Sequence, residues 1–341
     1  MSTQGYLERV QGLRDDPIWG QLGDIEGGKL WCKDKDVYTN SRLQSYGQCR
    51  QQYYFAWEMR LPEESRNLGA WRGNLTHFTI HGIHREKAWR DWEEVYVDRW
   101  QKLMDELESD EKGWSRDDID AKAVEKASDE ARMMVAGYVE RNHPETLGDE
   151  HRVLETEIPG VAILKHPRTG TCYRIACTLD QIRADGDGLN VTDLKTGKME
   201  PSAHYLAKNK QFSIAGLVMR HGTFRLPGDR RWLIAEYPKS MTYYQLNNLI
   251  PYQRATTKRG KRYEKGQLRG DPKFDVFRTE ADYDLAKAEI FQAIKGIRFK
   301  VFGRDEDGIR CSMCRYQRVC SGDFSMVPEN MLELADLSSL E

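Results

Sequence analysis

The chain has 341 residues, enough for about two domains or for one large core with additions. Its 52 Lys and Arg against 54 Asp and Glu give a net charge of −2, which excludes a globally basic nucleic-acid coat but not a local basic groove. Hydrophobic residues make up 39%, with 9 Trp and 16 Tyr, too many for a disordered chain.

The first half of the chain is predicted to be mainly helical. Residues 1–40 are interpreted as an irregular arm without the apolar segment of a secretory signal, so we expect a cytoplasmic protein in a reducing compartment. Apolar residues at helical spacing predict helices within 41–60, 74–108 and 116–142. No stretch approaches the ~20 apolar residues of a membrane span. Residues 1–148 are therefore interpreted as the arm and a helical subdomain.

After about residue 150 the pattern changes to short apolar runs that are typical of strands. Helices are expected at 203–221 and 279–297, and a polar, Gly-rich loop at 253–273. This mixture predicts an α/β core over residues 149–300, followed by a cysteine-containing segment and acidic tail at 301–341. The predicted strands are Val153–Ile158, Ala162–Lys165, Cys172–Ile182, Leu189–Lys195 and Arg231–Glu236.

Two of these strands flank Asp185–Gly188, whose Asp-Gly-Asp-Gly sequence is a strong hairpin turn signal. If the hairpin is symmetric, Asp180 lies opposite Asp193, with their Cβ atoms about 4.5–5.5 Å apart on one face. Lys195 follows Asp193 by two residues, so it points to the same face. Leu194 points to the other face, into the core.

Two carboxylates placed opposite each other repel, and a bound divalent cation removes that penalty. Hard oxygen ligands suit Mg²⁺ or Mn²⁺, which makes Asp180 and Asp193 candidate metal ligands together with the backbone carbonyl of Leu194. The ammonium of Lys195 beside the metal could stabilise charge on a phosphate. The alternative is a surface hairpin whose Asp and Lys side chains form solvated pairs.

Three histidines, His77, His81 and His84, are spaced to lie on one helical face. This spacing is compatible with a zinc site, and hence with a zinc-stabilised hydrolase, although the His-Glu-x-x-His order of zinc proteases is absent. For His81 and His84 we favour a polar stripe without a ligand.

The C-terminal cysteines Cys311, Cys314 and Cys320 form a compact set with Cys-x-x-Cys spacing. Three thiolates are one ligand short of either a four-cysteine iron–sulfur cluster or a structural zinc site. The fourth ligand must come from elsewhere in the chain. The alternative of zinc would take Cys32 or a histidine as that ligand.

A basic run within the 253–273 loop is a candidate contact for nucleic-acid phosphates, with Tyr263 available for base stacking. A solvated, flexible loop is the alternative. The basic residues are Lys258, Arg259, Lys261, Arg262, Lys265 and Arg269.

The spacing from Asp180 to the segment Asp193–Gly197, Asp-Leu-Lys-Thr-Gly, resembles the motif of PD-(D/E)XK nucleases, and within them the RecB-type branch. Gln211 is similar to the helical glutamine of that branch. Gly73 and His77 resemble its upstream Gly-x-x-x-His pattern. The resemblance implies that Asp180, Asp193 and His77 hold the metal, that Lys195 assists attack, and that Gln211 orients Lys195 or the DNA.

Cys49 begins the segment Cys-Arg-Gln-Gln-Tyr-Tyr-Phe, which resembles the Cys-containing entry helix of RecB-type nucleases. In CRISPR-associated RecB-type exonucleases and in the AddB nuclease, one N-terminal and three C-terminal cysteines hold a [4Fe–4S] cluster. The resemblance therefore implies such a cluster on Cys49, Cys311, Cys314 and Cys320, joining the two ends of the chain.

As a whole, the resemblance implies a restriction-endonuclease-like mixed sheet flanked by helices, with an N-terminal helical subdomain and a C-terminal iron–sulfur segment. It implies a metal-dependent DNA nuclease, an exonuclease on single-stranded ends in recombination, repair or CRISPR adaptation, in a prokaryotic cell or as a phage protein. Protein partners and oligomers are compatible with this function. The rival hypothesis is a non-catalytic partner that binds DNA ends.

Overall fold

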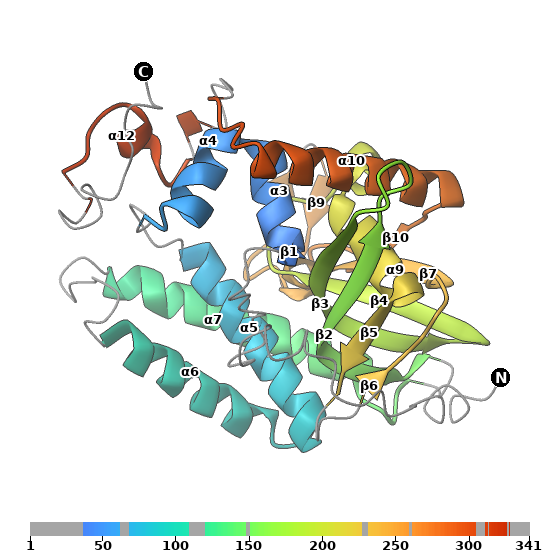
Figure 1. Cartoon of the computed structure of the whole chain (residues 1–341). Coiled ribbons are helices and arrows are strands. Elements are labelled where there is room, and N and C mark those ends of the chain that lie inside the picture. Colours follow the sequence, from blue (N-terminus) through green and yellow to red (C-terminus); the bar gives the residue numbers. More distant parts are fainter. Residues whose placement is uncertain are drawn as a thin grey trace.

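The computed structural model describes most of the chain between residues 37 and 327 (Figure 1). The predicted N-terminal arm up to residue 36, including Cys32, and the acidic tail after residue 327 lie outside the described residues. No described helix is both long and apolar enough to cross a bilayer. The described ranges are 37–61, 68–108, 120–147, 151–226, 231–258, 261–304, 311–312, 314–325 and 327.

An eight-stranded mixed sheet forms the centre of the molecule, in the order β10-β7-β4-β3-β2-β5-β6, with β1 beside β3. The β4–β7 and β1–β3 pairs are parallel and the other pairs are antiparallel, as the predicted α/β class requires. The strands are β1 (Val37–Thr39), β2 (Val153–Lys165), β3 (Cys172–Asp185), β4 (Gly188–Lys195), β5 (Gly222–Arg225), β6 (Arg231–Trp232), β7 (Ser240–Gln245) and β10 (Lys273–Val276).

Several elements differ from their prediction: the last residues of the expected arm, 37–40, form β1 and begin α3, the strand expected at Arg231–Glu236 ends at Trp232, and β5 and β10 were not predicted. Two further differences have identifiable reasons. The predicted break at Pro159 and Gly160 is absent, because the glycine lets β2 run close to β5: a Cβ there would lie 2.4 Å from the Phe224 ring. The central strand β7 was not predicted, because its sequence is polar although most of its residues are buried. One of them, Thr242, accepts a hydrogen bond from Asn190. The predicted 253–273 loop contains a small hairpin of β8 (Thr256–Lys258) and β9 (Lys261–Tyr263).

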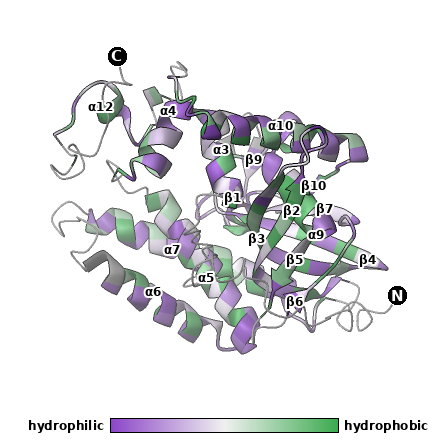
Figure 2. Cartoon of the chain, viewed as in Figure 1, coloured by the Kyte–Doolittle hydropathy of each residue, from purple (hydrophilic) through white to green (hydrophobic). Residues whose placement is uncertain are grey.

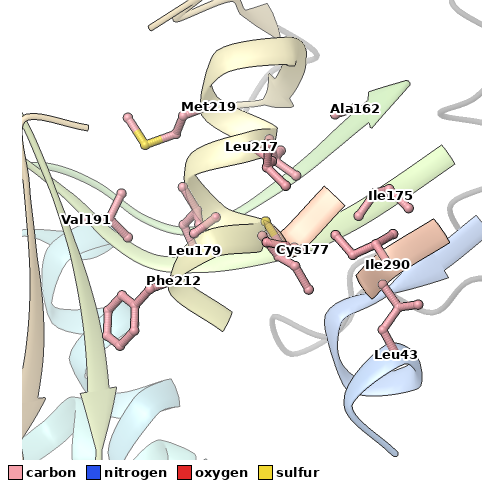
Figure 3. Packing of buried hydrophobic residues seen from close by; sticks show 14 of the residues in the cluster. Leu43, Ala162, Ile175, Cys177, Leu179, Val191, Phe212, Leu217, Met219 and Ile290 are labelled. Carbon is pink, nitrogen blue, oxygen red and sulfur yellow. The ribbon is translucent and has the colours of Figure 1, made fainter. Parts of the chain in front are cut away.

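One face of the sheet is covered by α3, α9 and α10, which share the larger hydrophobic core with the strands. Figure 3 shows Phe212, Leu217 and Met219 of α9 packed over Cys177 and Leu179 of β3. Because β1 and α3 belong to this layer, residues 37–48 complete the core although they precede it by more than 100 residues. The bounds are α3 (Asn40–Gln48), α9 (Lys210–His221) and α10 (Glu280–Arg298).

The opposite face is covered by α5 and α7, with α6 packed on both from outside. Figure 2 shows hydrophilic and hydrophobic residues alternating along α6 and α7, as expected for helices with one face in solvent. Domain boundaries at residues 148 and 300 remain a prediction. The bounds are α5 (Leu68–Glu86), α6 (Trp92–Glu108), α7 (Ala121–Asn142) and the short 3₁₀ helix η7 (Leu246–Leu249).

A polar network lies between this helical layer and the sheet. The Tyr138 hydroxyl lies 2.7 Å from His84 Nε2 and accepts a hydrogen bond of 2.7 Å from Gln181. Arg183 donates to Gln181 and to Asn142. Burial, the nearby Arg183 and His81 lower the pKa of His84 to about 3, so His84 stays neutral. The polar residue predicted at His84 is therefore satisfied by Tyr138 of α7, which in turn is bonded to Gln181 of β3.

His84 should make the protein less stable in mild acid. As the pH falls below 6.5, the ordinary pKa of histidine, His84 binds a proton in the unfolded chain but not in the folded protein. The free energy of unfolding should therefore fall by up to ~1.4 kcal/mol per pH unit toward pH 5, and be regained as pH rises. Urea unfolding of His84→Gln should show a smaller loss between about pH 6.5 and pH 5. Replacing the exposed His204 by Gln is the control, and equal slopes in all three proteins would contradict the assignment.

Candidate active site

The predicted hairpin register is confirmed. β3 and β4 pair from Asp185 with Gly188 to Gln181 with Thr192, and Asp180 and Asp193 are the next residues on the two strands. They do not continue the ladder. Instead, Asp180 Oδ2 accepts a hydrogen bond of 2.7 Å from the Leu194 backbone N–H. The Leu194 side chain is buried against the α5–α7 layer, so it points away from the carboxylates as predicted.

Asp193, Lys195 and Gln211 form a hydrogen-bonded triangle. Lys195 Nζ lies 2.9 Å from each Asp193 carboxylate oxygen and 3.2 Å from Gln211 Oε1. Gln211 Nε2 in turn donates to Asp193 Oδ1 at 2.6 Å. Gln211 is held at the start of α9, where the Asn209 side chain accepts from its backbone N–H. Asn209 also separates α9 from α8 (Ala203–Lys208), which divides the single helix predicted at 203–221.

His77, Glu157 and Asp180 converge beside this triangle. One ligand atom from each lies within 4.8 Å of the others, and no other such group of three occurs among the described residues. His77 Nδ1 is 3.4 Å from Glu157 Oε1 and 3.8 Å from Asp180 Oδ2. His77 comes from α5, so the helical layer supplies one member and the sheet supplies two. Asp193, predicted as a metal ligand, lies outside this group and contacts Lys195 instead.

Glu157 was missed from the sequence. It lies on β2 between Thr156, which pairs with Gln181, and Ile158, which pairs with Leu179, and so it stands level with Asp180. Its φ of 49° is in the left-handed region, an unusual conformation for a glutamate. Strain of this kind is often retained where a side chain must be aimed at a functional site. The sequence could have predicted this position from the turn between β2 and β3, because a symmetric hairpin about residues 168–169 places Glu157 opposite Asp180.

The charges in the site are arranged unequally. The pKa of Asp193 is raised to about 6, because the effect of burial exceeds the lowering by the adjacent Lys195. Burial and the charge of Glu157 raise the pKa of Asp180, whereas His77 lowers it. Lys195 has its pKa raised by Asp193 and Asp180 in spite of burial, so it is protonated at neutral pH. Although burial opposes it, the carboxylates of Asp180 and Glu157 raise the pKa of His77 to about 9.

These residues fit a hard divalent cation. The group offers two carboxylates and an imidazole nitrogen, the donor types that Mg²⁺ and Mn²⁺ accept. Asp193 Oδ2 is buried and accepts no well-aligned hydrogen bond, although Lys195 lies at ion-pair distance, so this oxygen retains a free lone pair. A cation would also relieve the repulsion that raises the Asp180 pKa. His77, Glu157 and Asp180 would hold it, with Asp193 adjacent.

A buried ion pair fixes α5 relative to the end of β4. Arg72 pairs with Glu130 of α7 and donates at 2.8 Å to the carbonyl of Thr196, the residue after Lys195. Lys198 also reaches Glu130, at 3.0 Å. Gly73 brings the helix close, since a Cβ there would lie 3.2 Å from Thr196 Oγ1. This packing explains the glycine four residues before His77.

His81 is not part of the group. Its Nδ1 lies 2.7 Å from the Thr156 hydroxyl, and burial lowers its pKa to about 4, with Arg85 and Arg99 contributing. The contact ties α5 to β2 at the residue before Glu157. As expected for His81, the histidine is a polar contact rather than a member of the cluster.

The four cysteines predicted to act together converge at the two ends of the described chain. Cys49 caps the short helix α4 (Arg50–Tyr53), and the π-helix η2 (Tyr54–Glu58) follows. Burial raises the pKa of the Cys320 thiol; Arg304 lowers it, and Cys314, Cys49 and Cys311 raise it further. Cys320 Sγ is also 3.7 Å from Gln51 Oε1.

A small hydrophobic cluster holds these two segments together. Phe55 of η2 packs against Tyr316, with ring centroids 5.9 Å apart, and Tyr316 donates to the Leu61 carbonyl. Val319 of α12 (Gln317–Cys320) is buried in the same cluster. The structure therefore brings Cys49 to the C-terminal set by packing across more than 250 residues of chain.

The segment 253–273, which contains the basic hairpin, is anchored to η7, which in turn contacts the residues after β4. Arg269 donates to Asn247 of η7 at 2.9 Å, and Asn248 donates to Glu200 and to the Asp271 carbonyl. Glu200 follows Lys195 by five residues. Arg262 is exposed and pairs with Glu264 at 2.9 Å, whereas Arg259 lies outside the described residues.

Comparison with known proteins gives one family. A model of the PD-(D/E)XK nuclease superfamily matches residues 38–321. A solved structure titled "Crystal structure of SSO0001" is 11% identical, covering 86% of this chain and 89% of that chain, with a TM-score of 0.30 that is too low to bear on function. No curated protein matches the sequence. Because the matched span covers most of the chain and contains the whole site, this protein belongs to the PD-(D/E)XK nuclease superfamily, a family of metal-dependent phosphodiester hydrolases.

Proposed function

We propose that this protein is a RecB-type DNA exonuclease that degrades single-stranded ends in recombination, repair or CRISPR adaptation. The observation that carries the nuclease activity is the position of the His77, Glu157 and Asp180 group beside Asp193 and Lys195. A non-catalytic DNA-binding protein has no need for a partly buried lysine held between a carboxylate and an amide. The same set of residues therefore argues against the non-catalytic alternative.

Each residue has a distinct task in this proposal. His77, Glu157 and Asp180 would hold a divalent cation, which would supply an activated water and neutralise charge on the phosphate. Lys195, kept protonated by Asp193, stabilises the charge that develops on the phosphate and is unsuited to be a base. Gln211 fixes the direction of the Lys195 ammonium by accepting from it and donating to Asp193. Asp193 Oδ2, which is ion-paired with Lys195, would also have a lone pair for the metal or for the attacking water.

The proposed activity is tested with anaerobically purified protein and end-labelled DNA. Single- and double-stranded substrates, each labelled at one end or the other, are incubated with Mn²⁺, Mg²⁺ or EDTA. We expect metal-dependent release of short products from single strands, and protection when both ends are closed in a circle. Degradation of circular single strands would overturn the exonuclease assignment but keep the nuclease. No cleavage with any metal would support the non-catalytic alternative.

We also propose a [4Fe–4S] cluster on Cys49, Cys311, Cys314 and Cys320. The support for the proposal is the resemblance in cysteine spacing, together with the packing of the segment that begins at Cys49 against the segment that carries the other three. The cluster would join the α4–η2 segment to the C-terminal segment and contribute to stability, as metal sites do. Visible absorption near about 400 nm with matching iron and sulfide would support the cluster, and zinc alone would exclude it.

The basic hairpin is proposed to contact DNA phosphates. Replacing Lys258, Arg259, Lys261 and Arg262 by Gln should weaken binding of all sequences alike. It should also flatten the salt dependence, because each phosphate that is no longer neutralised removes about 0.7 of slope on single strands and about 0.9 on duplex DNA. Binding is measured by fluorescence anisotropy over a range of salt concentrations.

The matched control removes the same number of charges from α6 and α7, where the residues are exposed: Lys102, Lys122, Lys126 and Arg132. If the slope falls equally in both quadruple variants, the effect is one of net charge, and the hairpin has no special role. An unchanged slope in the hairpin variant assigns the hairpin to solvent.

A further inference from the structure

An exposed aromatic side chain stands beside the proposed active site. Among the described tyrosines and tryptophans, Tyr205 has the most exposed side chain, at 47%, although it lies on the short helix α8 whose next residue, Leu206, is buried. Its ring contacts that of Tyr243 edge to face, with centroids 6.3 Å apart at 89°. One side of the ring therefore packs on Tyr243, and the rest is open to a ligand.

The position of Tyr205 is fixed relative to the reacting groups. Tyr243 is the parallel neighbour of Asp193 on β7, so the ring that supports Tyr205 lies directly beside the triangle. The Tyr205 hydroxyl accepts a hydrogen bond of 3.4 Å from Asn209, whose other amide atom caps α9 at Gln211.

The outward side of α8 combines this ring with a cation. Lys208 is exposed three residues after Tyr205, a spacing that places the two side chains next to each other on a helix. An aromatic face beside an ammonium is the combination that holds single-stranded nucleic acid, in which the base stacks on the ring and the cation meets the backbone. In a duplex the flat faces of the bases are covered by their neighbours, so stacking of this kind selects an unpaired base.

We propose that Tyr205 is a base-stacking residue of this nuclease, whose ring holds an unpaired nucleobase next to the phosphate that is cleaved. This inference rests on the proposed function and deepens it, because it names the feature that would make the site prefer single strands. Lys208 contacts the backbone of the same nucleotide. Tyr205 acts on substrate position and takes no part in the proton or phosphate chemistry.

The test is a binding cycle between the ring and the base. All proteins carry Lys195→Ala, so that Mn²⁺ can be present without cleavage, and binding is measured by anisotropy with single-stranded oligonucleotides in which one position at a time is abasic. Adding Tyr205→Ala should weaken binding of intact DNA about tenfold. One abasic position should weaken the Tyr205 protein similarly and cause no further loss in Tyr205→Ala, because stacking partners are coupled.

Two variants separate stacking from structure. Tyr205→Phe keeps the ring and should bind as the parent does, whereas loss equal to that of Tyr205→Ala would show that the hydroxyl contact to Asn209 is what matters and would overturn the proposal. Phe299→Ala removes an aromatic side chain that is 72% exposed at the end of α10 and should have no effect. The proposal would also be overturned if, at every abasic position tested, the loss of binding from Tyr205→Ala added to the loss from the missing base. If the parent binds no DNA, the proposed function itself fails, which is a different outcome.

Discussion

Lys195→Ala and Asp193→Ala should each reduce metal-dependent DNA cleavage by about 10²–10³ or more. Lys195 places positive charge where the phosphate gains negative charge, and Asp193 holds Lys195 in that position. The two should differ in metal dependence. Asp193→Ala removes a carboxylate next to the group that would bind the metal. Lys195→Ala leaves that group intact but removes the ammonium that pairs with Asp193. The measurement is the initial rate on end-labelled single strands over a range of Mn²⁺ concentrations.

Lys239→Ala is the matched control for this experiment. Lys239 also pairs with an aspartate of the same hairpin, Asp187 at 2.7 Å, but at the turn rather than at the site. It should cleave at the wild-type rate. Thermal unfolding of each variant separates a loss of chemistry from a loss of fold. Wild-type rates in either Lys195→Ala or Asp193→Ala would remove this hairpin from the active site.

Cys49→Ala should lose the iron–sulfur cluster as completely as Cys311→Ala, Cys314→Ala or Cys320→Ala, since three thiolates cannot complete a four-cysteine site. Losing the link between α4 and the C-terminal segment should also expose that segment to protease. Activity alone is not a sufficient readout, because Asp193 and Lys195 stay in place. The measurements are iron and sulfide content, the visible spectrum and limited proteolysis after anaerobic purification.

Cys172→Ala and Cys177→Ala are the controls, because Cys172 is an exposed thiol at the start of β3 and Cys177 is buried in the main core. Both should keep full iron content. Cys32 lies outside the described residues, and Cys32→Ala tests the alternative fourth ligand. Full occupancy in Cys49→Ala would disprove the split site, and loss in Cys32→Ala would move the ligand there.

Local patterns sufficed wherever the interacting residues are neighbours in sequence. The turn at Asp185–Gly188 and the two-residue period of a strand predicted the register that the structure has, and with it the positions of Asp180 and Asp193. The helix expected at 203–221 was also local, but it is divided, because Asn209 caps a new helix instead of continuing the old one.

Long-range contacts needed either the family resemblance or the folded chain. His77 was assigned from the resemblance, and only the packing of α5 on the sheet brings it within 3.8 Å of Asp180. Glu157 was missed although β2 and β3 form a hairpin. Its left-handed backbone is not visible in the sequence, and its partners His77 and Asp180 lie on two other segments. The polar strand β7 was missed because its burial comes from neighbouring strands and not from its own composition.

By itself the sequence determined the Asp180, Asp193 and Lys195 hairpin, because a tight turn and the pleat of a strand fix which residues share a face. Only the tertiary structure decided that Glu157 completes the cation group, that the segment beginning at Cys49 packs against the one ending at Cys320, and that Tyr205 stands exposed beside the site. These contacts close long stretches of chain, and their geometry depends on how whole layers pack. No local periodicity encodes that packing, since the burial of a residue depends on partners that are remote in sequence.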